Sequence, residues 1–132
     1  MTEAHDNPRL LKLTPNFLLG EFLPAEDALS DSALEPWILD NLYRLANRLQ
    51  VLRDILGKPV TVSSGYRTQA HNKAVGGHPN SYHQYGMAAD IIVREIPASE
   101  VQKLLKNWHG GLGAYAGFTH LDIRPHRARW RG

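Results

Sequence analysis

The order of helical and strand patterns along the chain predicts a single α+β domain, with an antiparallel sheet packed on helices. The 132 residues are the length of one ordinary domain. A long helical stripe is followed by short strands alternating with short helices, and no linker or internal repeat divides the sequence. We expect residues 1–12 to form a flexible N-terminal segment and residues 13–132 to form the domain.

The first half of the domain is predicted to hold a packed arm and one core helix. Residues 13–22 (LTPNFLLGEF) form a short apolar segment, which is typical of a packed arm. Pro36 suits the first turn of the helix that follows, and Gly57 suits its C-terminal cap. Between them, apolar residues recur at steps of three and four and share one helical face: Ile38, Leu42, Leu45, Leu49, Leu52 and Ile55.

The second half alternates strands and helices. Apolar and β-branched runs predict strands over 60–62, 87–93, 110–114 and 118–124. Thr68 begins a short helix that Gly76 and Gly77 stop. Ser99 and Gln102 have the spacing of a capping box, which predicts a helix running to about residue 108.

Composition limits the classes of function. The chain has no cysteine, so disulfides and thiolate metal sites are excluded and a metal would need His, Asp or Glu ligands. The N-terminus lacks a signal-peptide pattern, and no stretch approaches the roughly 20 apolar residues of a membrane span. The formal net charge is +2, with basic residues gathered near the end: Arg124, Arg127, Arg129 and Arg131. These form either a solvated terminus or a patch that meets nucleic acid or an anionic polymer such as cell wall.

Two histidine-containing segments carry the strongest chemical signal. His83 ends a loop, and Asp90 follows seven positions later inside an apolar strand, where a carboxylate is costly unless it is paired or binds metal. Along the last predicted strand, His120, Asp122 and Arg124 alternate and therefore share one face. Two histidines and one aspartate would leave the fourth position of a tetrahedral zinc open for water, which is the catalytic pattern.

Four motifs in this order resemble a known family. They are SGYR at 64–67, AVGG at 74–77, SYHQYGMAAD at 81–90 and THLDIR at 119–124. The chain is similar to the zinc D-alanyl-D-alanine carboxypeptidase family, which also includes L-alanyl-D-glutamate endopeptidases of phage endolysins and related bacterial enzymes. The core pattern Ser-x-His-x-x-Gly-x-Ala-x-Asp is matched in full, and the resemblance extends from about residue 13 to residue 130.

The resemblance implies a zinc peptidase domain with one Zn²⁺ per chain. Its ligands would be His83, Asp90 and His120. Arg67 stands where the family keeps an arginine that binds a substrate carboxylate or carbonyl, which suits a guanidinium. Ser81 matches a serine beside the zinc loop, where it would contact substrate or shape the loop through a local hydrogen bond.

One position departs from the family pattern. Many members keep an acidic residue or histidine, acting as general base, where this chain has Gly117 and Phe118. Asp122 is the candidate for that catalytic role, because it shares a strand face with His120. The alternative is that Asp122 orients a ligand histidine. His126 is a weaker candidate for the base.

The remaining aromatic residues divide by expected role. Tyr85 and Tyr115 are expected to line the groove. Trp37, Trp108 and Trp130 are expected to pack rather than to form ligand platforms. The other histidines, His71, His78 and His109, are expected in loops or on the surface.

The resemblance implies a zinc metallopeptidase that hydrolyses peptidoglycan stem peptides, foremost as an L-Ala-D-Glu endopeptidase. A D-Ala-D-Ala carboxypeptidase is the alternative activity, and a non-catalytic zinc-containing binding module is the alternative of another class. We expect a monomer with no nucleic-acid partner. It would be made in the cytoplasm without a signal peptide and act in the periplasm or cell wall after release, for which a holin-like pore is a candidate partner.

Overall fold

The structure, a computed structural model, describes residues 7–24 and 34–132. The part of the predicted flexible segment that covers residues 1–6 lies outside these ranges. Along the chain the elements are η1 (Pro8–Leu10), β1 (Lys12–Thr14), β2 (Phe17–Leu18), η2 (Leu19–Phe22), α3 (Pro36–Leu56), β3 (Val60–Ser64), α4 (Gln69–Ala74), η3 (Tyr82–Tyr85), β4 (Ala88–Val93), α5 (Ala98–Leu104), β5 (Gly111–Ala114), β6 (Thr119–Asp122) and β7 (Ala128–Arg131).

Helix α3 is the core helix that the sequence predicts. It begins at Pro36 and ends at Gly57, whose φ of 65° is the left-handed conformation that glycine adopts without strain. The predicted apolar face is buried with one exception, since Ile55 is 77% exposed. Two successive steps of three residues, from Leu49 to Leu52 to Ile55, each fall short of a full helical turn and rotate Ile55 off the buried face.

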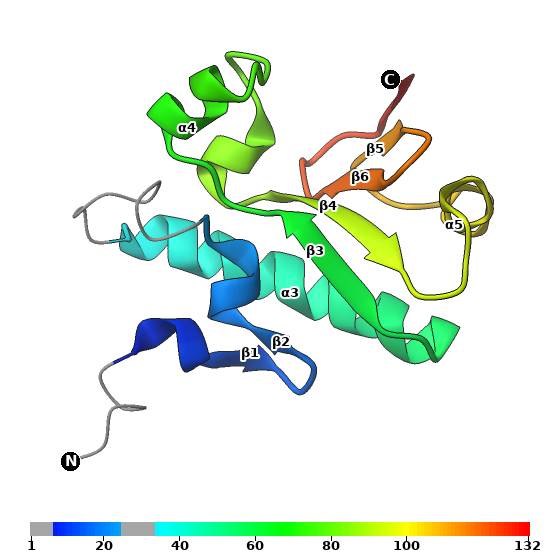
Figure 1. Cartoon of the computed structure of the whole chain (residues 1–132), viewed down its shortest axis with the longest axis horizontal. Helices are drawn as coiled ribbons and strands as arrows, with labels where there is room; N and C mark the ends of the chain where they lie inside the picture. The colour runs from blue at the N-terminus through cyan, green and yellow to red at the C-terminus, as the bar shows by residue number, and fades with distance from the viewer. Residues whose placement is uncertain (1–6, 25–33) are drawn as a thin grey trace.

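The five-stranded sheet has the order β3-β4-β6-β5-β7, and α3 runs across it (Figure 1). Four strands pair antiparallel as predicted, and β7 joins the edge of β5 in parallel. In the β4–β6 pair, Asp90 lies directly opposite His120. This register brings together two polar residues that are 30 positions apart in the sequence.

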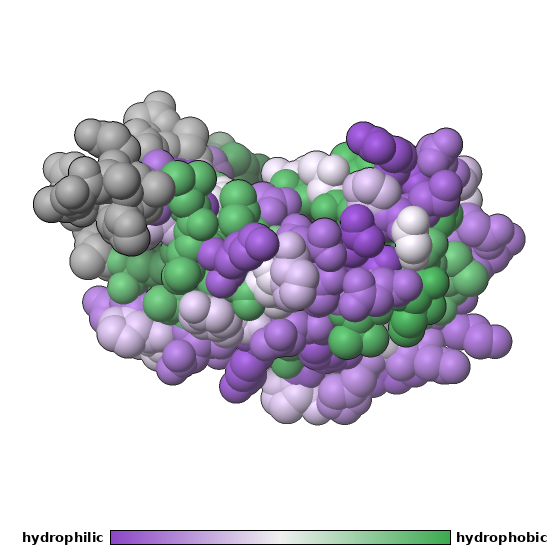
Figure 2. Space-filling view, turned by 90° about the horizontal axis from the view of Figure 1, so that it is seen from below, coloured by the Kyte–Doolittle hydropathy of each residue, from purple (hydrophilic) through white to green (hydrophobic). Residues whose placement is uncertain are grey.

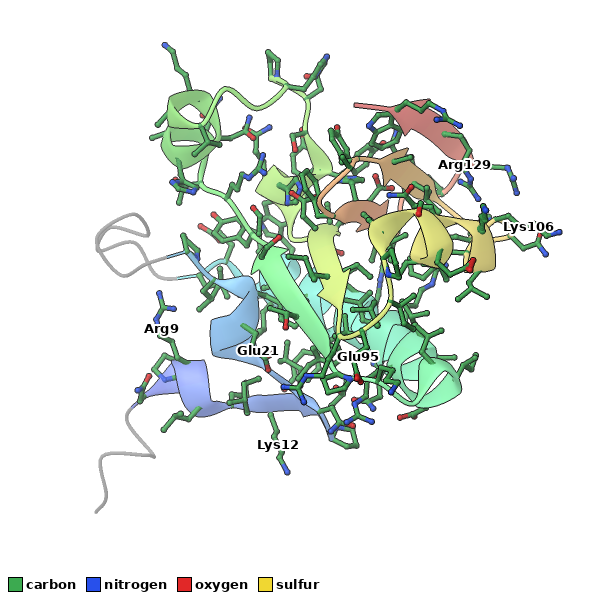
Figure 3. All side chains as sticks on the ribbon, turned by 45° about the vertical axis from the view of Figure 1, so that its right-hand side comes forward. Arg9, Lys12, Glu21, Glu95, Lys106 and Arg129 are labelled. Atoms are coloured by element: carbon green, nitrogen blue, oxygen red, sulfur yellow. The ribbon has the colours of Figure 1, made fainter. Side chains whose placement is uncertain are left out.

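Strand β7 shows that the arginine-rich terminus, expected as either a solvated end or a binding patch, is partly built into the fold. Its backbone pairs with β5, and the Arg129 guanidinium donates to the carbonyls of Lys106, Trp108 and Gly110. Arg127 also donates to the Lys106 carbonyl. Figure 3 shows the labelled Arg129 and Lys106 on the same side of the molecule. Part of the basic cluster therefore fastens the end of the chain to the loop after α5.

Helix α5 differs from the prediction at both ends. Its N-cap is Pro97 and no side chain caps it, so the predicted capping box is wrong. The Gln102 amide instead donates to the carbonyls of Tyr115 and Phe118, in the turn between β5 and β6. The helix ends at Leu104, short of the predicted residue 108. Gln102 therefore fixes a turn that carries two aromatic side chains.

The N-terminal arm packs as predicted. Its buried apolar side chains are Leu13, Phe17, Leu19 and Phe22. The arm also supports the chain after β3, because the Tyr66 amide donates to the Phe22 carbonyl at 2.6 Å. A β-carbon on Gly65 would lie 2.5 Å from that carbonyl oxygen, so only glycine allows this approach.

Within the described ranges, no helix has both the length and the apolar character needed to cross a bilayer. The face in Figure 2 is largely hydrophilic, with separate apolar patches.

Candidate metal centre and substrate pocket

Three buried side chains from different elements converge on one point. His83 comes from η3, Asp90 from β4 and His120 from β6. One ligand atom from each lies within 4.8 Å of the other two. The structure therefore assembles the three residues that the sequence predicts as metal ligands.

Local hydrogen bonds orient His83. The Ser81 hydroxyl accepts from the His83 amide at 3.2 Å and caps η3, and Gly86 ends this helix in the left-handed conformation. The His83 ring donates from Nδ1 to the Gly65 carbonyl at 2.7 Å. This bond occupies Nδ1 and leaves Nε2 facing Asp90 Oδ1 at 3.2 Å.

His120 is oriented by a carboxylate. Its Nε2 donates to Asp122 Oδ2 at 2.8 Å, which leaves Nδ1 facing Asp90 Oδ1 at 3.0 Å. A histidine ligand commonly donates its second ring N–H to a carboxylate or carbonyl, which raises its basicity. Both histidines of the triad have such a partner.

The Asp122 carboxylate is surrounded by donors. It is 0% exposed and accepts from His120, from the Gly111 amide at 2.9 Å and from two nitrogens of the Arg124 guanidinium at 2.8 and 2.7 Å. A β-carbon on Gly111 would lie 2.2 Å from this carboxylate, so a glycine opposite Asp122 is required. Asp122 is not among the residues that line the pocket. Of the two roles left open by the sequence, these contacts favour orientation of His120 over proton transfer.

The pKa values of the site follow from these contacts. Burial would raise the pKa of Asp90, but hydrogen bonds from His120 and His83 outweigh it and hold the pKa well below its usual range. The pKa of Asp122 is likewise low, because bonds from Arg124 and His120 outweigh burial. Burial would lower the pKa of His120, but hydrogen bonds to Asp122 and Asp90 outweigh it and raise the pKa.

The donor set fits zinc. Zn²⁺ accepts imidazole nitrogen and carboxylate oxygen, and three protein ligands with one open position form a catalytic site. Each histidine directs one ring nitrogen at the ionised carboxylate between them. A metal ion bound here would take the place of any proton on these two nitrogens.

Zinc affinity is expected to fall as the pH falls, because protons compete with the metal for His120. Hydrogen bonds to Asp122 and Asp90 raise the pKa of His120 in the metal-free protein, so the onset lies at a higher pH than for an ordinary histidine. Below that pKa we expect affinity to drop about tenfold per pH unit. Competition titrations against a fluorescent chelator would measure this, and an affinity that stays constant down to about pH 5 would contradict the ligand assignment.

Arg67 and Ser81, the two residues predicted to contact substrate, both line the pocket. The Arg67 guanidinium donates to Ser64 and Asn72, each at 3.1 Å, and to Asp90 Oδ2 at 3.5 Å. It therefore lies next to the carboxylate ligand. Ser81 shapes the His83 loop through its hydroxyl while bordering the same pocket.

The triad opens into a cavity of about 650 Å³. Tyr115 lines it as predicted, with its ring stacked on Phe118 at 4.5 Å. Trp130 also lines the cavity, although the sequence predicted a packing role for it. The centre of its ring lies 5.0 Å from that of His120, and its Nε1 donates to the Tyr115 hydroxyl. The full lining is Arg67, Gly76, Gly77, His78, Asn80, Ser81, Tyr82, His83, Asp90, Tyr115, Phe118, His120, Arg124 and Trp130.

Two predicted neighbours of the pocket are placed elsewhere. Tyr85 does not line it, and its ring packs against Trp37 and Tyr82. His126, the weaker candidate for the general base, is exposed and also lies outside the lining. His78, predicted to be a loop histidine, does border the cavity.

Comparison with known families agrees with this geometry. The family model described as Peptidase M15 matches residues 15–122, which include the whole triad and Arg67. The chain belongs to the peptidase M15 family. In this M15 chain the matched region runs from the N-terminal arm to Asp122, and β7, with its pocket residue Trp130, lies beyond it.

Curated relatives extend the M15 assignment. The chain is 33% identical over 103 residues to the peptidoglycan L,D-endopeptidase MepK of Escherichia coli K12, covering 72% of this chain and 54% of that protein. It is 49% identical over 45 residues to the zinc D-Ala-D-Ala carboxypeptidase of Streptomyces albus G, covering 33% of this chain and 18% of that protein. A probable MepK of Haemophilus influenzae is 29% identical over 100 residues, covering 70% and 53%. The chain spans about half the length of the MepK relatives.

Proposed function

We propose that this M15 chain is a zinc-dependent peptidase that hydrolyses peptides of peptidoglycan. The observation that carries the proposal is the buried triad of His83, Asp90 and His120, which opens into a cavity bordered by two arginines. The names of the relatives support the substrate class, since they describe a peptidoglycan endopeptidase and a D-Ala-D-Ala carboxypeptidase. Action on this substrate would place the protein at the cell wall.

The chain's own residues would prepare the reaction. When bound, zinc supplies a Lewis acid that polarises the scissile carbonyl and lowers the pKa of water. Arg67, beside Asp90, would hold the carbonyl or carboxylate next to the scissile bond. Asp122 would keep His120 in the tautomer that presents Nδ1 to the metal.

The bond we propose is L-Ala-D-Glu within the stem peptide. The longer alignment, to MepK, supports an endopeptidase. The shorter and more identical alignment supports cleavage of the terminal D-Ala-D-Ala bond as the second candidate. Both candidates use the same triad and differ in which part of the stem peptide the cavity holds.

Mass spectrometry of purified muropeptides, incubated with zinc-loaded protein and with chelator-treated protein, would test the proposal. Zinc-dependent release of the stem from D-glutamate onward, with L-alanine left on the muropeptide, would establish the endopeptidase. Loss of the terminal D-alanine alone would establish the carboxypeptidase. Intact muropeptides after treatment with protein that binds zinc would reject the enzyme and support a binding module.

Asp122→Asn separates the two roles considered for Asp122. If Asp122 orients His120, the variant should bind zinc about 10- to 100-fold more weakly, because a neutral amide is a poorer partner for the ring N–H. Chelator competition would measure the affinity, with exposed Asp40→Asn as the matched control. Unchanged zinc affinity together with lost hydrolysis would instead make Asp122 the proton acceptor.

A further inference from the structure

Two guanidinium groups, those of Arg67 and Arg124, line the pocket beside the metal ligands. Each is paired with a carboxylate of the site, Arg67 with Asp90 and Arg124 with Asp122. An anionic group of a substrate would therefore bind through the N–H groups that these pairs leave unused.

Arg124 is held rigidly in the wall. Its Nε and Nη2 donate to Oδ1 and Oδ2 of Asp122 at 2.8 and 2.7 Å. Its guanidinium carbon lies 4.4 Å from the centre of the Tyr82 ring and 5.1 Å from that of Trp130. A guanidinium held at one edge and close to two aromatic rings loses little further freedom when it binds a ligand.

One edge of this guanidinium remains available. The bonds to Asp122 use the Nε–Nη2 edge, so Nη1 and the second hydrogen of Nη2 form a fork with no hydrogen-bond partner among the described residues. The Arg124 side chain keeps 17% of its surface exposed, and it borders the pocket. In Arg67, by contrast, all three nitrogens have partners.

The neighbouring arginines do not share this arrangement. Arg127 and Arg129 donate to backbone carbonyls after α5, and neither lines the pocket. Arg127 is exposed and directly precedes β7. Its substitution is therefore a suitable control for the loss of one guanidinium from this segment.

We infer that Arg124 is a specificity residue that binds a free carboxylate of the substrate near the scissile bond. This inference rests on the proposed function. A planar fork matches a carboxylate in two parallel hydrogen bonds, whereas a carboxamide offers one acceptor and places an N–H against the cation. A stem peptide offers two such groups, the α-carboxylate of D-Glu and the free carboxylate of diaminopimelate. The site therefore distinguishes the acid from the amide form of its substrate.

Pairs of stem peptides that differ only by acid or amide at one of these positions would test the inference. Both members of a pair, one isotopically labelled, compete in one reaction with zinc-loaded protein, so the product ratio reports relative kcat/KM whatever the overall rate. Calorimetric Kd values for the same peptides give the preference independently of hydrolysis. The proteins are wild type, R124Q, R124K and the control R127Q, each with its zinc content and thermal unfolding recorded.

We expect wild type and R127Q to prefer the acid about ten- to a hundredfold at one of the two positions, which identifies the carboxylate. In R124Q the preference should fall to about one, and in R124K, which keeps the charge but has no fork, to roughly two- to threefold. Equal use of acid and amide by the wild type at both positions, or an R124Q preference equal to that of wild type, would overturn the inference. A wild-type protein that binds acid over amide without cleaving either would refute the proposed hydrolysis and leave this inference standing.

Discussion

Asp90→Ala is expected to abolish zinc-dependent hydrolysis, lowering kcat/KM by at least about a thousandfold. Asp90 lies between both ligand histidines, at 3.2 Å from His83 Nε2 and 3.0 Å from His120 Nδ1. Its loss removes one ligand and the negative charge that the two imidazoles and the metal share. Zinc content by mass spectrometry under native conditions and muropeptide hydrolysis would both be measured.

The control for this prediction is Asp40→Ala, which removes an exposed carboxylate from α3. It should bind zinc and hydrolyse peptides as the wild type does. Hydrolysis by the Asp90→Ala protein within tenfold of the wild-type rate would show that the reaction centre lies elsewhere.

Leu45→Ala is expected to lower the free energy of unfolding by about 2–5 kcal/mol. Leu45 is 0% exposed in the middle of α3, within the core that the helix and the sheet share. The deleted isopropyl group would leave a cavity that the packed neighbours fill only in part. Urea denaturation of the zinc-free protein, followed by circular dichroism, would measure the change without a contribution from metal binding.

Ile55→Ala on the same helix is the matched comparison. Since Ile55 is 77% exposed, its truncation should change the free energy of unfolding by about 0.5 kcal/mol or less. Equal losses for the two variants would mean that α3 does not present the buried face described here.

Much of the site could be predicted from sequence because its signals are local. Asp90 lies inside the apolar run of β4, and His120 lies in the alternating pattern of β6. A polar side chain at such a buried position is costly unless it has a hydrogen-bond partner or binds a metal. The β4–β6 register then brings them opposite each other. The long helix could also be predicted from the sequence, since its periodicity, Pro36 and Gly57 all indicate the same boundaries.

The remaining features depend on contacts between segments that carry no local pattern. Strand β7 is four residues long and rich in arginine, and it exists because β5 offers an open edge. Trp130 reaches the pocket only through that pairing, over Gly113, where a β-carbon would lie 2.6 Å from the indole nitrogen. The surroundings of Asp122 likewise need the Gly111 amide and the Arg124 guanidinium, so spacing alone could not decide between its two roles.

The most direct test of the central claim is a zinc titration of muropeptide hydrolysis by the metal-free protein. The triad and its pocket predict that activity rises linearly with added zinc and reaches a plateau at one zinc per chain. A protein that binds one zinc and leaves muropeptides intact, or one that cleaves them equally well without zinc, would contradict it.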